Sequence, residues 1–132
     1  MQILEISTRR AGRHAVVGLR GELDLAGAAD LRSRLRAACA EARGRVALEM
    51  SELSFIDSTG LSVLVEYHEK ARAAGGRLLL VAPHPGVVKV LGVTGLDRHL
   101  RVCDRLEDVE DQEDREEPER RERREDQDRG VR

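Results

Sequence analysis

The run Leu78–Ala82 places the tightest limit on the fold of this chain. It consists of five consecutive apolar residues and follows directly on the glycine pair Gly75-Gly76 and Arg77. The length is that of a strand, and a strand without alternating polar residues is typically covered on both faces. Strands of this kind lie in parallel sheets on which helices pack. The run therefore predicts an α/β protein in which this strand has parallel neighbours and helices on both faces.

The residues before this strand divide into a hairpin, a helix, a third strand and a second helix. β-branched residues mark the strands, and apolar residues at intervals of three and four mark the helices. We expect strands over 3–7, 15–19 and 46–50, a first helix from about residue 26 to Gly44, and a second helix from Ser58 to Gly75. The apolar stripe of the second helix is expected to comprise Leu61, Leu64, Val65, His68 and Ala71, flanked by Val63 and Tyr67.

After Ala82 the segments of apolar residues are shorter and less regularly spaced. We expect a short helix over 87–91, a loop over 92–97, a last strand over 99–103 and one or two helical turns over 104–110. The complete order gives a mixed sheet of about five strands, an initial hairpin followed by parallel strands, with about four helices packed on it. Right-handed crossovers connect the parallel strands of such sheets.

The composition changes at Asp111. Residues 111–132 contain ten acidic residues, seven arginines and a single aliphatic residue, Val131. Such a segment cannot bury enough apolar surface to offset the entropy of ordering, so we expect it to be disordered. We therefore expect one domain over residues 1–110 and a charged C-terminal tail over 111–132, which is either simply solvated or a docking arm.

Composition also excludes several classes of function. A net charge of −2 and only two aromatic residues, Phe55 and Tyr67, argue against nucleic-acid binding. No apolar run is long enough to insert into a membrane, and the N-terminus does not resemble a secretory signal. Cys39 and Cys103 form no Cys-x-x-Cys pair, so we expect buried thiols, no metal site and no cofactor. The prediction is a soluble, cytoplasmic protein.

The segment Phe55–Gly60 joins a strand to the second helix and carries an exposed hydroxyl, Ser58, at the start of that helix. Unpaired N–H groups and the helix dipole favour negative charge there. Ser58 could accept a phosphate, act as a nucleophile, or cap the helix, a role that Asp57 could equally fill. A nucleophile elbow needs Gly-x-Ser-x-Gly, and Ile56 occupies the first glycine position. Since the four histidines are scattered as well, we expect no enzyme.

Three segments together resemble a known family. Gly21–Asp24, Leu48–Leu64 and Leu91–Asp97 are similar, in this order, to the STAS domain, specifically to the single-domain anti-sigma factor antagonists of bacteria. The resemblance covers residues 3 to about 109. It departs from the common pattern at Glu49, where aspartate is usual, and at Ser62, where glycine is frequent. Ser62 and Thr59 are therefore alternative acceptors of a modification.

The resemblance implies a regulator that works by partner switching. In this family the serine of the Asp-Ser-x-Gly motif, here Ser58, is phosphorylated by an anti-sigma factor that is also a serine kinase, and a serine phosphatase reverses the modification. The unphosphorylated form binds the anti-sigma factor and releases a sigma factor, which regulates transcription. The implied partner-binding residues are Asp24, Asp57, Ser58, Thr59 and Gly60. The alternative is a STAS subunit of a stress-signalling scaffold or of a transporter complex.

Overall fold

The computed structural model describes residues 3–109. In chain order the elements are β1 Glu5–Ala11, β2 His14–Leu23, α1 Leu25–Glu41, β3 Arg45–Ile56, α2 Ser58–Ala73, β4 Arg77–Val81, α3 Pro85–Thr94 and β5 Arg101–Cys103, with short 3-10 helices at Leu96–Arg98 and Leu106–Asp108. The predicted tail over 111–132 lies outside the described residues. The division into a domain over 1–110 and a disordered tail therefore stays a prediction.

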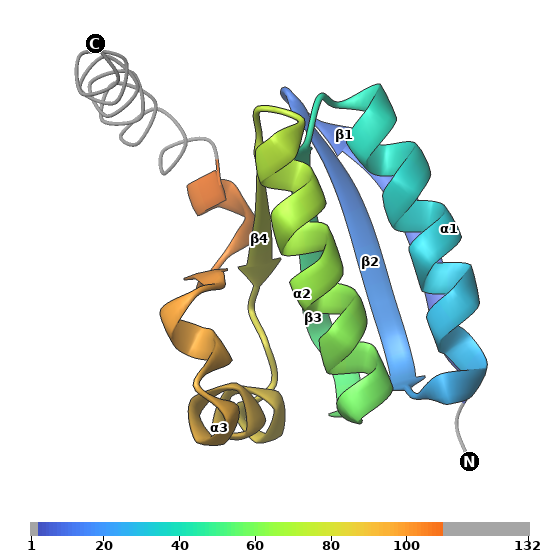
Figure 1. Cartoon of the computed structure of the whole chain (residues 1–132), viewed down its shortest axis with the longest axis vertical. Helices are drawn as coiled ribbons and strands as arrows, with labels where there is room; N and C mark the ends of the chain where they lie inside the picture. The colour runs from blue at the N-terminus through green and yellow to red at the C-terminus, as the bar shows by residue number, and fades with distance from the viewer. Residues whose placement is uncertain (1–2, 110–132) are drawn as a thin grey trace, which may run out of the picture.

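The strands form one five-stranded sheet in the order β1-β2-β3-β4-β5. β1 and β2 form an antiparallel hairpin, whereas the β2–β3, β3–β4 and β4–β5 pairs are parallel (Figure 1). This confirms the expected mixed sheet with an initial hairpin. Parallel pairing brings the carboxyl ends of β2 and β3 to the same edge, where α1 and α2 begin.

The expected number of helices is wrong. Within residues 3–109 the structure has three α-helices, and the helix predicted over 104–110 is only the 3-10 helix Leu106–Asp108. Its two apolar side chains, Leu106 and Val109, are too few to offset the cost of nucleating a longer helix. The loop predicted over 92–97 is wrong too, because α3 continues to Thr94 and ends at Gly95 in the left-handed conformation (φ 79°).

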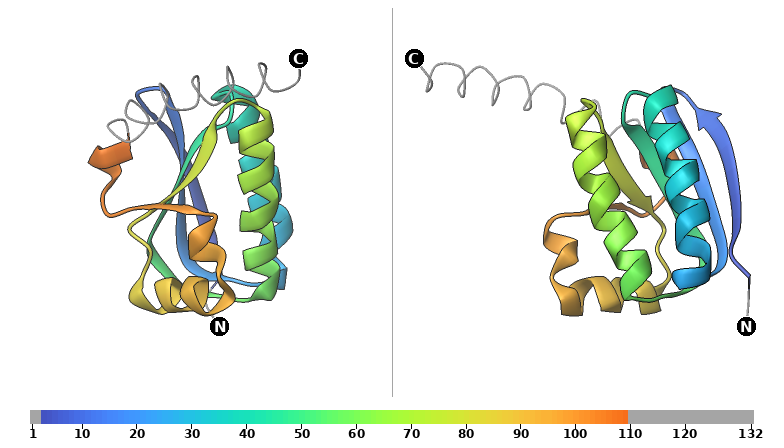
Figure 2. Two further views of the ribbon diagram at one scale, coloured as in Figure 1. Left: turned by 60° about the vertical axis from the view of Figure 1, so that its left-hand side comes forward. Right: turned by 45° about the vertical axis from the view of Figure 1, so that its right-hand side comes forward.

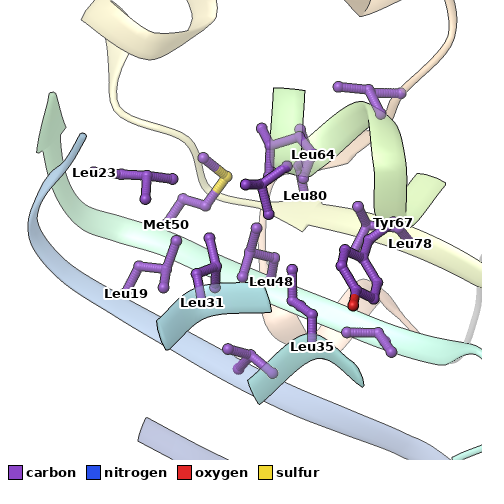
Figure 3. Close-up of a cluster of buried hydrophobic side chains, with 14 of the residues drawn as sticks. Leu19, Leu23, Leu31, Leu35, Leu48, Met50, Leu64, Tyr67, Leu78 and Leu80 are labelled. Atoms are coloured by element: carbon purple, nitrogen blue, oxygen red, sulfur yellow. The ribbon is translucent and has the colours of Figure 1, made fainter. Parts of the chain in front are cut away.

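α1 and α2 lie on one face of the sheet and α3 lies past the end of β4, and this corrects the expectation that helices cover both faces of 78–82 (Figures 1 and 2). Leu78 and Leu80 point toward α1 and α2 and belong to the main core (Figure 3). Leu79 and Val81 point the other way, into a second cluster that includes Val109. The apolar run correctly indicated burial on both faces, but a short segment of irregular chain can bury one of them.

Leu64 and Ala71 of α2 are buried as predicted, but the buried stripe is rotated toward the two residues that were expected only to flank it. Val63 and Tyr67 are buried, whereas Val65 is 40% exposed. Gly60 sets this rotation, because a Cβ there would lie 2.7 Å from side-chain atoms of both Leu23 and Ile56. The helix can approach the sheet this closely only where it carries no side chain.

Polar contacts join α1 to α2 above the core. The Glu66 carboxylate accepts hydrogen bonds from Arg32 Nε and Lys70 Nζ, both at 2.9 Å. These hydrogen bonds, that of Arg32 first, lower the pKa of Glu66. The Tyr67 hydroxyl, from a buried ring, donates to the Arg32 carbonyl oxygen at 3.1 Å. The two helices are thus fixed side by side at their middles.

The two cysteines differ in burial. Cys103 is 1% exposed, as the sequence led us to expect, whereas Cys39 is only partly buried. Desolvation raises the pKa of the Cys39 thiol, with a smaller opposing effect from Lys70.

Candidate functional site

The site lies where β2 and β3 end side by side. Leu23 and Ile56 are paired in the parallel register and are both buried. The residues that follow them, Asp24 and Asp57, each directly precede a helix, and the backbone N–H of Asp57 donates to the Leu23 carbonyl at 3.1 Å. The N-termini of α1 and α2 are therefore neighbours at one edge of the sheet (Figure 1).

Both aspartates are helix caps. Asp24 Oδ1 accepts a hydrogen bond from the Ala26 N–H at 3.1 Å, and Asp57 Oδ1 accepts one from the Gly60 N–H at 3.0 Å. Of the two residues that could cap α2, Asp57 fills the role, so the alternative that Ser58 is the cap is wrong. Ser58 is instead the first residue of the helix, with its side chain exposed.

The three hydroxyls of the first turn of α2 have different surroundings. Ser58 is exposed, Thr59 is half-buried, and Ser62 is exposed with its Oγ donating to the Ser58 carbonyl at 3.0 Å. Ser58 also lies closest to the N-terminal end of the helix, where the amides of the first turn have no intrahelical acceptor. Of the three, Ser58 is thus placed best to carry a negatively charged group.

Two glycines hold the predicted site residues together. Gly21 has φ 105°, and a Cβ there would lie 2.4 Å from the Ile3 carbonyl oxygen, so only glycine fits. Its carbonyl accepts a hydrogen bond from Ser54 Oγ at 3.1 Å, which ties β2 to β3 just before the site. Gly60, buried beneath the first turn of α2, brings Ser58 and Thr59 against the end of β2. The five predicted residues, Asp24, Asp57, Ser58, Thr59 and Gly60, therefore lie on two adjacent helix N-termini.

Two apolar residues at this edge were missed. Leu25 is 75% exposed at the start of α1, and Phe55 is 48% exposed near the end of β3. Phe55 has Glu22 as its partner in the register between β2 and β3. Leu25 precedes buried Ala28 by three residues, so helical spacing would have placed it in the core. No sequence signal could have identified it as exposed.

Two of the histidines among residues 3–109 have positions that can be stated relative to the helices. His68 lies ten residues further along α2, or about 15 Å at the rise of an α-helix. His84 caps α3 and accepts the Gly86 N–H at 3.3 Å through Nδ1. Residues 3–109 contain no set of three His, Cys, Asp or Glu side chains arranged to hold a metal ion. Among the same residues, no helix has the length and apolar character needed to cross a membrane. The described residues thus form a small α/β domain.

Comparison with known proteins identifies the family. The STAS domain model matches residues 5–109, and this chain belongs to the STAS domain family. An anti-sigma F factor antagonist of Lysinibacillus sphaericus is 31% identical over 94 residues, which cover 70% of this chain and 78% of that protein. A Thermotoga neapolitana protein, provisionally named an anti-sigma factor antagonist homologue, is 33% identical over 64 residues, or 48% of this chain. That alignment spans only 57% of the relative's length.

A solved structure agrees with this assignment. The crystal structure of an anti-sigma factor antagonist from Mycobacterium paratuberculosis superposes with a TM-score of 0.73 at 25% identity. The superposition covers 81% of this chain and 91% of that protein. The similarity to the STAS domain that the three sequence segments indicated is thereby confirmed.

Proposed function

We propose that this protein is an anti-sigma factor antagonist whose binding is switched off by phosphorylation of Ser58. In its unphosphorylated form it binds an anti-sigma factor that is also a serine kinase, and so releases a sigma factor; a serine phosphatase restores the binding form. The observation that carries the proposal is the exposed Ser58 at the first position of α2, with the cap role already filled by Asp57. The family assignment supports it. The protein then acts in the cytoplasm as a binding partner and not as an enzyme.

The fold can accept the added phosphate. Phosphorylation adds about −1.5 to −2 charge and three acceptor oxygens. At the N-terminus of α2 the dipole and the first-turn amides offset part of this charge, by about 0.3–1 kcal/mol at an exposed position. The Gly60 N–H already donates a hydrogen bond to Asp57, and the phosphate need not replace this hydrogen bond. We therefore expect the modified protein to remain folded.

Phosphorylation acts on the interface with the partner. The phosphate lies next to Asp57 and on the same edge as Asp24, so the modified surface carries three acidic groups. A like-charge mismatch across an interface costs several kcal/mol. A loss of about 3 kcal/mol weakens binding on the order of a hundredfold.

The exposed apolar side chains at the same edge extend the proposed partner surface. Leu25 and Phe55 flank the two caps, and interface cores are enriched in aromatic and apolar residues. We therefore add Leu25 and Phe55 to the partner-binding residues. Their role differs from that of Ser58, since they contribute affinity in the unphosphorylated form and carry no switch.

The test combines modification with binding. Incubated with its kinase and ATP, the protein should gain one phosphate by intact mass, and the Ser58→Ala variant should gain none. Calorimetric titration with the anti-sigma factor should show that Ser58→Ala keeps the affinity and that Ser58→Asp loses it. Thr59→Val and Ser62→Ala are the matched controls and should be phosphorylated like the natural chain. Unchanged binding of Ser58→Asp would refute the switch.

The alternative is a STAS subunit of a stress-signalling scaffold or of a transporter complex. Affinity capture from the native cell separates the two possibilities. Recovery of a small ATP-binding kinase supports the antagonist, whereas recovery of a membrane transporter or a multi-domain scaffold supports the alternative. Intact mass before and after phosphatase treatment, on the same sample, reports the modification independently of the partner.

A further inference from the structure

The face of the sheet away from α1 and α2 differs between its two ends. Where the parallel strands begin, this face carries the buried residues Val16, Ala47 and Leu79, on which Leu106 and Val109 pack. Figure 2 shows the last 3-10 helix of the described chain on this side of the sheet. Where the same strands end, beside the Ser58 edge, the face carries exposed apolar side chains instead.

Glu22 and Phe55 form part of one row at this second end. The two residues are partners in the parallel register of β2 and β3. The residues that follow them, Leu23 and Ile56, have buried side chains in the main core beneath α1 and α2. Because successive side chains of a strand point to opposite faces, Glu22 and Phe55 point away from those helices.

Ile3 extends this row beyond the start of β1. The antiparallel register of β1 and β2, continued by two residues, sets Ile3 beside Glu22. Leu4 packs against the main core, so Ile3 points to the opposite face. Ile3 is 85% exposed and Phe55 is 48% exposed. We call Ile3, Glu22 and Phe55 the open row, in which two large apolar side chains flank one carboxylate.

The charged side chains around the open row are mostly acidic. The next row of the same face is Glu5–Arg20–Glu52, and Glu49 lies on this face further along β3. Arg20 Nε lies 3.4 Å from a carboxylate oxygen of Glu52 and offsets one of these charges. With Glu22 there are four carboxylates and one arginine, so the net charge of this surface is 1 − 4 = −3.

This combination fits a partner whose contact surface is basic and apolar. Charges across an interface are complementary, and exposed aromatic and aliphatic side chains supply the apolar centre of an interface. A phosphate on Ser58 strengthens the preference, because it adds about −1.5 to −2 charge. Ser58 follows Phe55 by three residues, so at most about 11 Å of chain separates them. A basic partner on the open row therefore binds the phosphorylated form more tightly.

We infer that the open row is the docking surface for a basic partner that recognises the phosphorylated form, and that this partner is the serine phosphatase. The second step rests on the proposed function, in which the phosphatase is the partner that binds after phosphorylation. The phosphatase transfers the phosphoryl group to water, which releases inorganic phosphate and restores the Ser58 hydroxyl. Phe55 borders both partner surfaces, whereas Ile3 and Glu22 belong to this one. The same added charge thus releases one partner and attracts the other.

A short synthetic peptide in which lysine and valine alternate probes the surface on the full chain. In amide correlation spectra, the peptide should shift signals of residues 3–5, 20–22 and 52–55 and leave those of 30–41 and 62–73 in place. Glu22→Lys should weaken binding about threefold or more, and Ser58→Asp should strengthen it about twofold or more. The matched peptide with glutamate in place of lysine should not bind. Absent shifts, shifts spread over both faces, or equal affinity for all three chains would overturn the surface.

Dephosphorylation kinetics test the occupant. The phosphatase is isolated from the native cell by its activity on the phosphorylated chain. Glu22→Lys and Ile3→Ser should each raise KM about threefold or more and keep kcat, since both residues dock the partner and neither touches the phosphate. Matched controls elsewhere on the surface are Asp30→Lys, at an exposed position of α1, and Val93→Ser, at an 82% exposed position of α3. Both controls should keep KM and kcat.

The two proposals fail separately in these experiments. Unchanged binding of Ser58→Asp to the anti-sigma factor would refute the switch and leave the peptide result standing. An unchanged KM in Glu22→Lys and Ile3→Ser, or an equal rise in the controls, would overturn docking on the open row while the switch stands. A cell extract without phosphatase activity on the phosphorylated chain would overturn the phosphatase as the occupant.

Discussion

Removing the Asp57 side chain separates its structural role from its charge. In the Asp57→Ala variant the Gly60 N–H loses the acceptor that now lies 3.0 Å away. The backbone hydrogen bond from Asp57 to Leu23 remains, so the register of the strands should be kept. The perturbation is thereby confined to the first turn of α2, directly beneath Ser58.

The expected cost follows from the one hydrogen bond lost. An N-cap aspartate replaced by alanine lowers the free energy of unfolding by about 1 kcal/mol, within a range of about 0.5–2. For a domain of this size that is about 4 °C or more in the melting temperature. Asp57→Asn keeps the acceptor and loses only the charge near the helix dipole, which is a smaller loss of about 0.3–1 kcal/mol.

Urea unfolding followed by circular dichroism measures these differences. The order of stability should be natural chain, Asp57→Asn, then Asp57→Ala, with unchanged m-values. Asp24→Ala is a parallel case on α1, and Ser58→Ala, a surface change without a cap bond, should stay within about 0.5 kcal/mol of the natural chain. If Asp57→Ala matched the natural chain, the cap would contribute nothing and the assignment of the N-cap to Asp57 would be refuted.

Three other substitutions test the packing of α2. Gly60→Val should destabilise the domain by about 1–3 kcal/mol or more through overpacking, measured by urea unfolding, and a neutral result would contradict the close contact. Tyr67→Phe removes the hydrogen bond to the Arg32 carbonyl and should cost about 0.5–1.5 kcal/mol by the same assay; full stability would show that the bond is weak. The Glu66→Gln variant tests whether the ionisation of Glu66 makes the stability of the fold depend on pH. The pKa of Glu66 is lowered in the fold, so its contribution is present above the unfolded pKa and is lost as the pH falls through the folded pKa. In thermal melts the natural chain should be more stable than Glu66→Gln at pH 7, and this difference should disappear below about pH 4. A difference that stays constant with pH would argue against this coupling.

Local patterns predicted the sheet well because each strand and helix carries its own signal. The sequence predicted the hairpin, the parallel strand at 78–82 and the glycines near which the helices end. The start of α2 at Ser58 was readable as well, since a cap residue directly precedes it. This was enough to bring Asp24 and Asp57 to one edge, because parallel strands end together.

The sequence did not predict the features that depend on how the helices and strands pack against one another. The rotation of α2 depends on Gly60 meeting Leu23 and Ile56, which lie on two strands. The exposure of Leu25 depends on where α1 begins relative to the sheet, and helical spacing favoured burial. The cover on Leu79 depends on the path of the chain after β5, where no periodic pattern exists. Each of these is a tertiary contact between residues that are distant in sequence.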